Sequence, residues 1–251
     1  MTTIDFLICS KDNADELKRV TEELDKNLNP AFESFLYVIP KDGYLKGSQF
    51  FNASRKSYVQ EPKGSTIALH YGFQNSSAKW VCWLNDDIGF KDSKVFIESL
   101  RREIDENKDT KLFGFVENRN KQKAVNIGRH CSFGCVRKDF YFEHYENGNP
   151  YIKYFWDNEI MDFAIEAGCW KQTNIEIEHY WNHKGLDKNQ YKSDEDNYNE
   201  RRIKRVFPRT VAGYFKNKID TEFLIENIRF ANKGKSFEMI EDNDKFLISE
   251  V

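Results

Sequence analysis

Three consecutive polar residues, Asn85, Asp86 and Asp87, directly follow the apolar segment Trp80 to Leu84. Two adjacent carboxylates and an amide at the end of a buried strand offer the oxygen ligands that hard divalent cations prefer, so they indicate a Mg²⁺ or Mn²⁺ site. Such a cation often takes only one or two protein carboxylates and completes its shell with phosphate oxygens and water, which suits a diphosphate-bearing substrate. Asp and Asn are also common turn residues, and the acidic pair by itself fits a solvated turn equally well.

The segments before this pair predict alternating strands and helices. Residues 4 to 9 and 35 to 39 are short apolar runs typical of strands, and residues 17 to 28 carry apolar side chains at helical spacing. Residues 65 to 76 predict a second helix, which precedes the strand at 80 to 84. Strands apolar on both faces and separated by helices indicate a mostly parallel sheet covered on both sides.

Ligands of such sheets bind at the carboxyl ends of the strands, so the polar residues just after each strand should converge on one crevice. In the first half of the chain these residues are Ser10, Lys11, Asp12, Asp42, Gly43, Asn85, Asp86 and Asp87.

The second half is less regular and predicts a mixed sheet. Residues 111 to 117, 132 to 136 and 173 to 178 read as strands, and residues 155 to 167 read as a helix that Gly168 ends. We therefore expect an α/β domain at residues 1–185 with a mixed, mostly parallel sheet flanked by helices.

From about residue 186 the chain is polar and turn-rich before two stretches that predict helices, Arg201 to Arg205 and Thr221 to Phe230. Residues 186–251 are therefore expected to form a mostly helical C-terminal extension. The basic stretch Arg201 to Arg205 is most often a solvated helix face, although it could also contact phosphates of a nucleic acid or anionic lipid.

Composition restricts the partners and the cellular compartment. The 251 residues carry a formal net charge of only −3, so nothing in the overall charge favours a nucleic acid or a membrane surface. No run approaches the roughly 18 apolar residues of a membrane-spanning helix. Five cysteines, an odd number, and the absence of a signal-peptide pattern favour reduced thiols in the cytoplasm. Cys131 and Cys135 lack a second ligand pair at zinc-site spacing, so strand burial explains them better than zinc.

Segments 64 to 72 and 79 to 87 resemble the family-two glycosyltransferases of the GT-A fold. In that family a glycine and an Ala-Arg-Asn-x-Gly helix precede a strand that ends in Leu-Asp/Asn-x-Asp. Gly64 corresponds to the glycine that precedes this helix in the family. Ala68 and Gly72 match the Ala and the Gly of the helix, and His70 replaces its Asn.

Further matches follow in the same order. Residues 132 to 140, which include Gly134, resemble the small-residue strand that precedes an arginine and a helix, and Trp156-Asp157-Asn158-Glu159 resembles Glu-Asp-x-Asp. By this alignment Asp157 occupies the position of the family's catalytic base. The strand at 173 to 179 ends in His179, where many family members place a histidine near the donor phosphates or the metal. His183 is the alternative candidate for this histidine. The segments around Asp12 and Asp42 match most loosely.

The resemblance covers about residues 3 to 185, with a nucleotide-sugar half at 1–118 and an acceptor half at 119–185. It implies metal-dependent transfer of a sugar from a nucleoside-diphosphate sugar, UDP by family default, to a hydroxyl acceptor. The expected cation is Mn²⁺ or Mg²⁺, and inversion at the anomeric carbon is the expected outcome. Asp157 would take the acceptor proton, Asp87 and His179 would hold the metal, and the donor would be contacted by Ser10, Asp12, Asp42, Gly64, Asp86 and Gly134.

Each of these roles has an ordinary structural alternative. Asp157 lies where a helix N-cap or a first-turn acid favoured by the helix dipole is expected, and His179 follows an alternating strand and suits a structural role. Asp12 and Asp42 are typical turn residues. The acceptor stays open among a saccharide, a lipid-linked sugar, a protein side chain and a hydroxylated DNA base.

Two other functions compete with glycosyl transfer. A nucleotidyltransferase is expected to carry a glycine-rich phosphate loop after its first strand, whereas residues 9 to 13 contain no glycine. A non-catalytic sugar- or nucleic-acid-binding protein could keep the same fold without a working base.

Overall fold

The computed structural model describes residues 2–10, 14–29, 33–40, 55–60, 65–119, 122–123, 131–180, 188–206, 237–242 and 245–250. Internal contacts divide the chain into two units, Met1–Leu186 and Asp187–Val251. The elements of the first unit are β1 (Ile4–Cys9), α1 (Ala14–Asp25), β2 (Glu33–Pro40), β3 (Arg55–Gln60), α2 (Ser65–Asn75), β4 (Trp80–Asn85), β5 (Ile88–Gly89), α3 (Ser93–Glu106), β6 (Leu112–Arg119), β7 (Gln122–Lys123), β8 (Gly134–Arg137), α4 (Lys138–Tyr145), α5 (Trp156–Glu166) and β9 (Trp170–His179).

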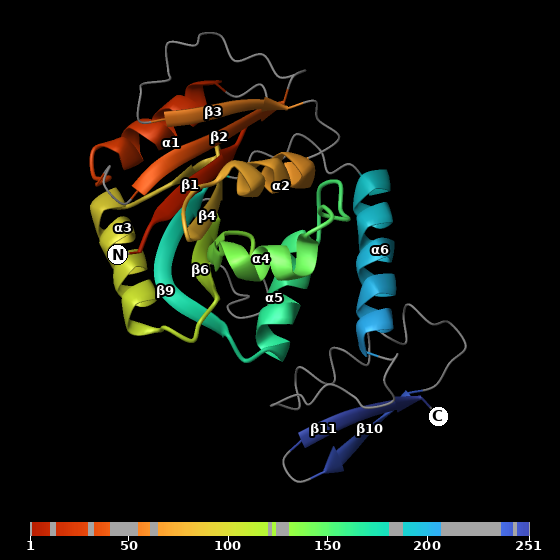
Figure 1. Cartoon of the computed structure of the whole chain (residues 1–251). Coiled ribbons are helices and arrows are strands. Elements are labelled where there is room, and N and C mark those ends of the chain that lie inside the picture. Colours follow the sequence, from red (N-terminus) through yellow and green to blue (C-terminus); the bar gives the residue numbers. More distant parts are fainter. Residues whose placement is uncertain are drawn as a thin grey trace. The chain divides into compact units, whose positions relative to one another are not determined.

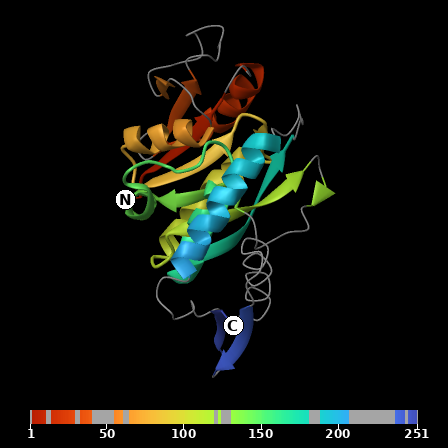
Figure 2. The same ribbon diagram turned by 90° about the vertical axis from the view of Figure 1, so that its right-hand side faces the viewer.

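A nine-stranded sheet in the order β3-β2-β1-β4-β8-β6-β9-β5, with β7 paired to β6, forms the centre of this unit (Figure 1). The strands from β3 to β4 are parallel, whereas β8 runs antiparallel to both β4 and β6. Strand β9 is parallel to β6, and the short β5 is antiparallel to β9. The strands splay rather than lie flat, as expected of a twisted sheet (Figure 2). The α/β fold with a mixed sheet, predicted from the alternation of elements, is confirmed.

Helices cover both faces of the sheet, with α1 and α3 on one side and α2, α4 and α5 on the other (Figure 1). Strand β1 shows why such covering is needed, because Phe6, Leu7 and Ile8 are all fully buried although they point to alternate faces. Helix α1 buries Leu17, Val20 and Leu24, which recur at helical spacing. These contacts fix the strand ends that carry the polar residues.

Helix α5 begins and ends at unusual backbone positions. Phe155, at its N-cap, has φ 68°, a left-handed conformation that bulky residues rarely adopt. At the other end Gly168 has φ 66°, which glycine adopts without cost. The predicted stop at Gly168 therefore has a direct structural reason.

The second unit contains α6 (Lys188–Val206) and an antiparallel pair, β10 (Phe237–Asp242) and β11 (Lys245–Glu250), drawn in blue in Figure 2. Helix α6 includes the predicted helical stretch Arg201 to Arg205. The two strands differ from the expectation of helices in this part, and Thr221 to Phe230 lies outside the described residues. Among the helices that the structure describes, none has the length and apolar character needed to cross a membrane.

Candidate functional site

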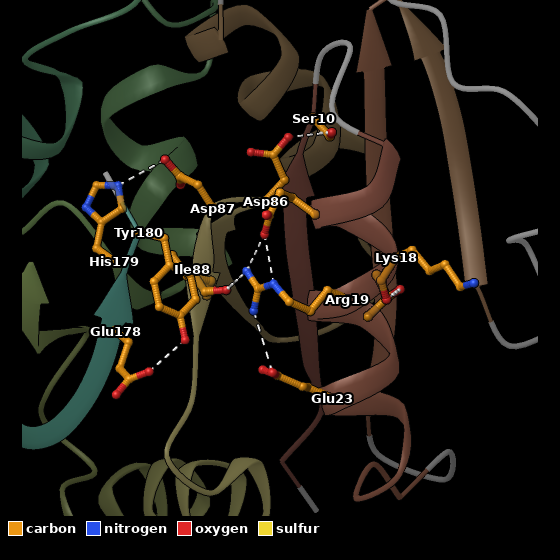
Figure 3. Close-up of polar contacts among 12 residues, drawn as sticks. Ser10, Lys18, Arg19, Glu23, Asp86, Asp87, Ile88, Glu178, His179 and Tyr180 are labelled. Atoms are coloured by element: carbon orange, nitrogen blue, oxygen red, sulfur yellow. Dashed lines mark hydrogen bonds and ion pairs between the residues drawn. The ribbon is translucent and has the colours of Figure 1, made fainter. Parts of the chain in front are cut away.

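The acidic pair lies in the turn between β4 and β5, at the carboxyl ends of the central strands. Because β1 and β4 are paired with Cys9 opposite Asn85, the residues that follow these two strands are neighbours. Ser10 Oγ donates a hydrogen bond of 2.6 Å to Asp86 Oδ2 (Figure 3). Burial, with a contribution from the charge of Asp86, raises the pKa of the Cys9 thiol to about 12, so this cysteine stays protonated. The sheet thus brings Ser10 and Asp86 together, as the sequence predicted.

Asp87 points to the other side of this turn, toward His179 at the end of β9 (Figure 3). The short β5 pairs with β9 so that Ile88 lies opposite His179, and the Tyr180 N–H donates to the Asp87 carbonyl at 2.8 Å. The side chains meet with His179 Nε2 3.2 Å from Asp87 Oδ2. Two predicted metal ligands that are 92 residues apart in sequence are therefore in contact.

The second ring nitrogen of His179 contacts a carboxylate on the neighbouring strand. His179 Nδ1 lies 2.6 Å from Glu117 Oε1, and the two side chains are only 11% and 10% exposed. Burial lowers the pKa of His179, but the hydrogen bonds and charges of Asp87 and Glu117 outweigh it and raise the pKa to about 9. Without a metal, His179 is therefore an imidazolium held between two carboxylates at neutral pH.

The Asp87 carboxylate fits a cation site, because its Oδ1 is buried and has no hydrogen-bond partner within the described part of the protein. A buried carboxylate oxygen without a partner is costly, and a bound cation would satisfy it. Among the described residues no group of three or more His, Cys, Asp or Glu side chains could hold a metal. One carboxylate and one imidazole are too few ligands for a metal held by the protein alone, so Asp87 and His179 would fit only an ion that takes its other ligands from a substrate and water.

The junction of β5 and β9 is held by Arg19 of α1 and by Tyr180 (Figure 3). Arg19 Nη2 donates to the Ile88 carbonyl at 2.5 Å, and its guanidinium lies 4.8 Å from the centre of the Tyr180 ring. Tyr180 Oη donates to Glu178 at 2.7 Å, and this bond raises the pKa of Tyr180 to about 12. A Cβ on Gly89 would lie 2.6 Å from Tyr180 Oη, so glycine leaves room for the ring.

Asp157 lies in the first turn of α5, one residue after Trp156. The Trp156 ring packs edge-on against Trp83 of β4 with 5.0 Å between centroids, which ties this helix end to the strand that leads to the acidic pair. Burial raises the pKa of the Cys131 thiol well above its ordinary value, and the charge of Asp157 adds to the effect. The N-cap position belongs to Phe155, so Asp157 does not cap the helix.

Two residues of the family-like motifs have structural roles. Glu159 is buried, and Tyr145 Oη donates to its Oε2 at 3.0 Å, so it faces the core. His70, which stands where the family has Asn, is buried with its Nδ1 3.0 Å from Tyr141 Oη.

Gly134 of β8 is explained by packing, because a Cβ there would lie 2.4 Å from the Phe113 carbonyl and 2.6 Å from the Trp83 ring. Its predicted contact with the donor stays a prediction. Asp12, Asp42, Gly64 and His183 lie outside the described residues.

Sequence reasoning did not single out Glu117 as a site residue. Its signal was present, since it is a carboxylate at the end of the predicted strand 111 to 117. The predicted crevice included only residues that follow strands in the first half of the chain, whereas β6, in the second part of the sheet, ends beside His179 through its parallel pairing with β9.

No protein-family profile matches the chain, and no curated protein matches its sequence. Solved structures do match it. Residues 1–349 of S. aureus TarS give a TM-score of 0.68 at 9% identity, covering 92% of this chain and 72% of that one. The same fragment in complex with UDP-GlcNAc gives 0.65 at 7% identity, covering 90% and 72%.

A third similar structure is glucosyl-3-phosphoglycerate synthase from Mycobacterium tuberculosis in complex with Mn²⁺, UDP-glucose and phosphoglyceric acid. Its TM-score is 0.62 at 11% identity, and the match covers 88% of this chain and 85% of that one. These proteins are GT-A glycosyltransferases, and the chain described here has their fold.

Proposed function

We propose that this protein is a metal-dependent glycosyltransferase that moves a sugar from a nucleoside-diphosphate sugar, with UDP favoured, to a hydroxyl acceptor with inversion. The observation that carries the proposal is the Asp87–His179 contact at the carboxyl edge of a GT-A sheet, with a buried Asp87 oxygen that has no partner among the described residues. Similar structures contain UDP-GlcNAc in one case and Mn²⁺ with UDP-glucose in another, which supports this class of donor.

Asp87 and His179 would hold Mn²⁺ or Mg²⁺, with a carboxylate oxygen and the imidazole Nε2 as ligands. When bound, the ion would act as a Lewis acid that stabilises the negative charge of the departing diphosphate. The protein fixes both ligands through the pairing of β5 with β9 and through the backbone bond from Tyr180 to Asp87. Preorganised ligands need little rearrangement when the donor arrives.

The donor would lie along the carboxyl ends of β1 and β4, in the nucleotide-sugar half at residues 1–118. Asp86, oriented by the 2.6 Å bond from Ser10, is proposed to accept hydrogen bonds from the ribose or the transferred sugar. Asp12, Asp42 and Gly64 remain proposed donor contacts on the resemblance alone, and Gly134 would line the donor site from β8.

Asp157 is proposed as the general base of the acceptor half at residues 119–185. Its carboxylate would take the proton of the acceptor hydroxyl while that oxygen forms a bond to the anomeric carbon. The bond from this carbon to the diphosphate oxygen breaks at the same time, and the electron pair leaves with the diphosphate. The packing of Trp156 on Trp83 holds the start of α5 against β4, which supports this placement.

Turnover of UDP-glucose and UDP-GlcNAc with Mn²⁺ tests this role, with water as the acceptor in the absence of another. Asp157→Asn should lower kcat by about 10²–10⁴-fold, the usual contribution of a general base, and leave donor affinity unchanged. Asp162→Asn, on the same helix, is the matched control. NMR of the released sugar should show an inverted anomeric centre.

Unchanged turnover in Asp157→Asn would remove Asp157 from the mechanism. A wild-type protein that binds the donor with Mn²⁺ but turns over neither donor would instead favour a non-catalytic sugar-binding protein of the same fold.

A further inference from the structure

We infer that Glu117 is a positioning residue, which holds the His179 imidazole so that its Nε2 faces the cation shared with Asp87. This inference rests on the proposed metal site. It assigns a function to a buried carboxylate that the reaction scheme does not otherwise use.

The Glu117 carboxylate and the His179 imidazole are both buried, and burying such groups costs free energy unless hydrogen bonds or opposite charges offset it. The Glu117 side chain is 10% exposed and His179 11%, and a charge taken this far out of water needs an opposite charge or hydrogen bonds to persist. The 2.6 Å distance between Oε1 and Nδ1 is that of a charge-assisted hydrogen bond. The contact is therefore a buried, hydrogen-bonded pair rather than a surface ion pair.

The two strands that carry this contact explain its geometry. Strands β6 and β9 are parallel neighbours, with Glu117 opposite Ile177 and Arg119 opposite His179. The Glu117 side chain thus reaches diagonally across to the histidine from the adjacent strand. The sheet holds both backbones, so the direction of the imidazole is set by the sheet and not by a loop.

The contact determines which ring nitrogen is presented to Asp87. Nδ1–H donates to Glu117, which leaves Nε2 directed at the Asp87 carboxylate 3.2 Å away. Phe133 meets the imidazole edge-on, with 5.1 Å between centroids and planes at 89°, so the ring cannot turn freely. A carboxylate on the remote nitrogen of a metal-bound histidine fixes the ring orientation and increases the basicity of the ligand nitrogen.

Glu117 itself is not placed as a third ligand. It lies against Nδ1, whereas Asp87 lies against Nε2, and these nitrogens point away from different edges of the ring. This agrees with the finding that no group of three or more such side chains in the described residues could hold a metal. Glu117 therefore acts on the cation through His179.

The test measures Mn²⁺ affinity by electron paramagnetic resonance at a fixed concentration of UDP, in the wild type, Glu117→Ala and Glu117→Gln. We expect Glu117→Ala to weaken Mn²⁺ binding by about 10- to 100-fold, the usual effect of removing such an outer-shell partner. Glu117→Gln keeps an acceptor oxygen and should fall between the wild type and Glu117→Ala. UDP affinity without metal should be the same in all three proteins.

Glu176→Ala is the matched control. Glu176 is a carboxylate on the same strand pair, and its Oε2 accepts from Lys91 Nζ at 2.6 Å and from Asn118 Nδ2 at 3.1 Å, so its loss should leave Mn²⁺ affinity unchanged. Circular dichroism and thermal unfolding verify that each variant is folded. If Glu117→Ala does not fold, the nearly isosteric Glu117→Gln decides the question.

The outcomes separate this inference from the proposed function. Wild-type Mn²⁺ affinity in folded Glu117→Ala, or in Glu117→Gln if only that variant folds, overturns the positioning role and leaves the proposed metal site standing. A wild-type protein that binds no Mn²⁺ in the presence of UDP overturns the metal site, and the positioning role with it.

Discussion

At the scale of residues, the acidic turn divides into two side chains with different surroundings. Asp86 is engaged by Ser10, whereas Asp87 faces His179 and keeps one buried oxygen without a partner in the described residues. Adjacent positions in a turn can point in opposite directions, so the sequence alone could not assign the metal to one of them. The family resemblance predicts Asp87 as the metal ligand. Its contact with His179 and its buried oxygen support this prediction, which metal-binding experiments have to test.

His179 makes the stability of the metal-free protein depend on pH. Its folded pKa of about 9 lies above the unfolded value near 6.5, so its contribution is fully present below pH 6.5 and disappears as the pH rises through 9. The lost stabilisation is on the order of 3 kcal/mol for a shift of this size. Urea unfolding of the metal-free wild type and His179→Gln between pH 6 and 10 measures it.

The difference in unfolding free energy between these two proteins should shrink as the pH rises. A constant difference across this range would show that His179 does not titrate with the raised pKa. Other groups that titrate between pH 6 and 10 are present in both proteins, so their contributions to the difference largely cancel.

The prediction of residues from sequence failed where the partner came from a distant strand. Glu117 and His179 are 62 positions apart, and they meet only because β6 and β9 pair. Gly134 has a plain packing reason that no sequence pattern shows, since it depends on the Trp83 ring and the Phe113 carbonyl. Local patterns identify residue types suited to chemistry, but contacts across the sheet decide how they are used.

At the scale of elements, the two-residue strand β5 has a large effect on the site. It aligns Asp87 with the end of β9, and its Gly89 leaves room for Tyr180, which in turn lies under Arg19. Two residues carry no periodic signal, so sequence analysis did not predict this strand. The buried apolar runs at 4 to 9 and 80 to 84, by contrast, were predicted almost to the residue.

A double-mutant cycle tests the packing at this junction. Gly89→Ala places a methyl group 2.6 Å from Tyr180 Oη, so it should destabilise the protein by about 1–3 kcal/mol, as overpacking usually does. In Gly89→Ala/Tyr180→Ala the clash is absent, so the double variant should lose less stability than the sum of the single variants. Urea denaturation of the four proteins measures the coupling.

Strictly additive losses would mean that Gly89 and Tyr180 do not share this space. The glycine at position 89 would then have a reason other than the space that Tyr180 occupies.

At the scale of the whole molecule, the fold was predictable because several motifs occur in the right order. The alternation of strands and helices predicted an α/β sheet, and the ordered segments from Gly64 to His179 indicated the GT-A fold that the solved structures share. The acceptor was not predictable, because no segment of the acceptor half carries a specific signature. In the second unit, the hairpin of β10 and β11 was missed because its short strands lie in a stretch expected to be helical.

Metal-dependent binding of a nucleotide sugar is tested most directly by the thermal stability of the protein with a panel of nucleoside-diphosphate sugars, with and without Mn²⁺. Binding to the folded state at 100 times the dissociation constant contributes about 2.7 kcal/mol. For a protein of this size that corresponds to a rise in Tm of about 5–10 °C. We predict such a rise for a UDP-sugar only when Mn²⁺ is present, and no metal-dependent rise in Asp87→Ala. No metal-dependent shift with any donor, or a full shift in Asp87→Ala, would contradict metal-dependent donor binding through Asp87.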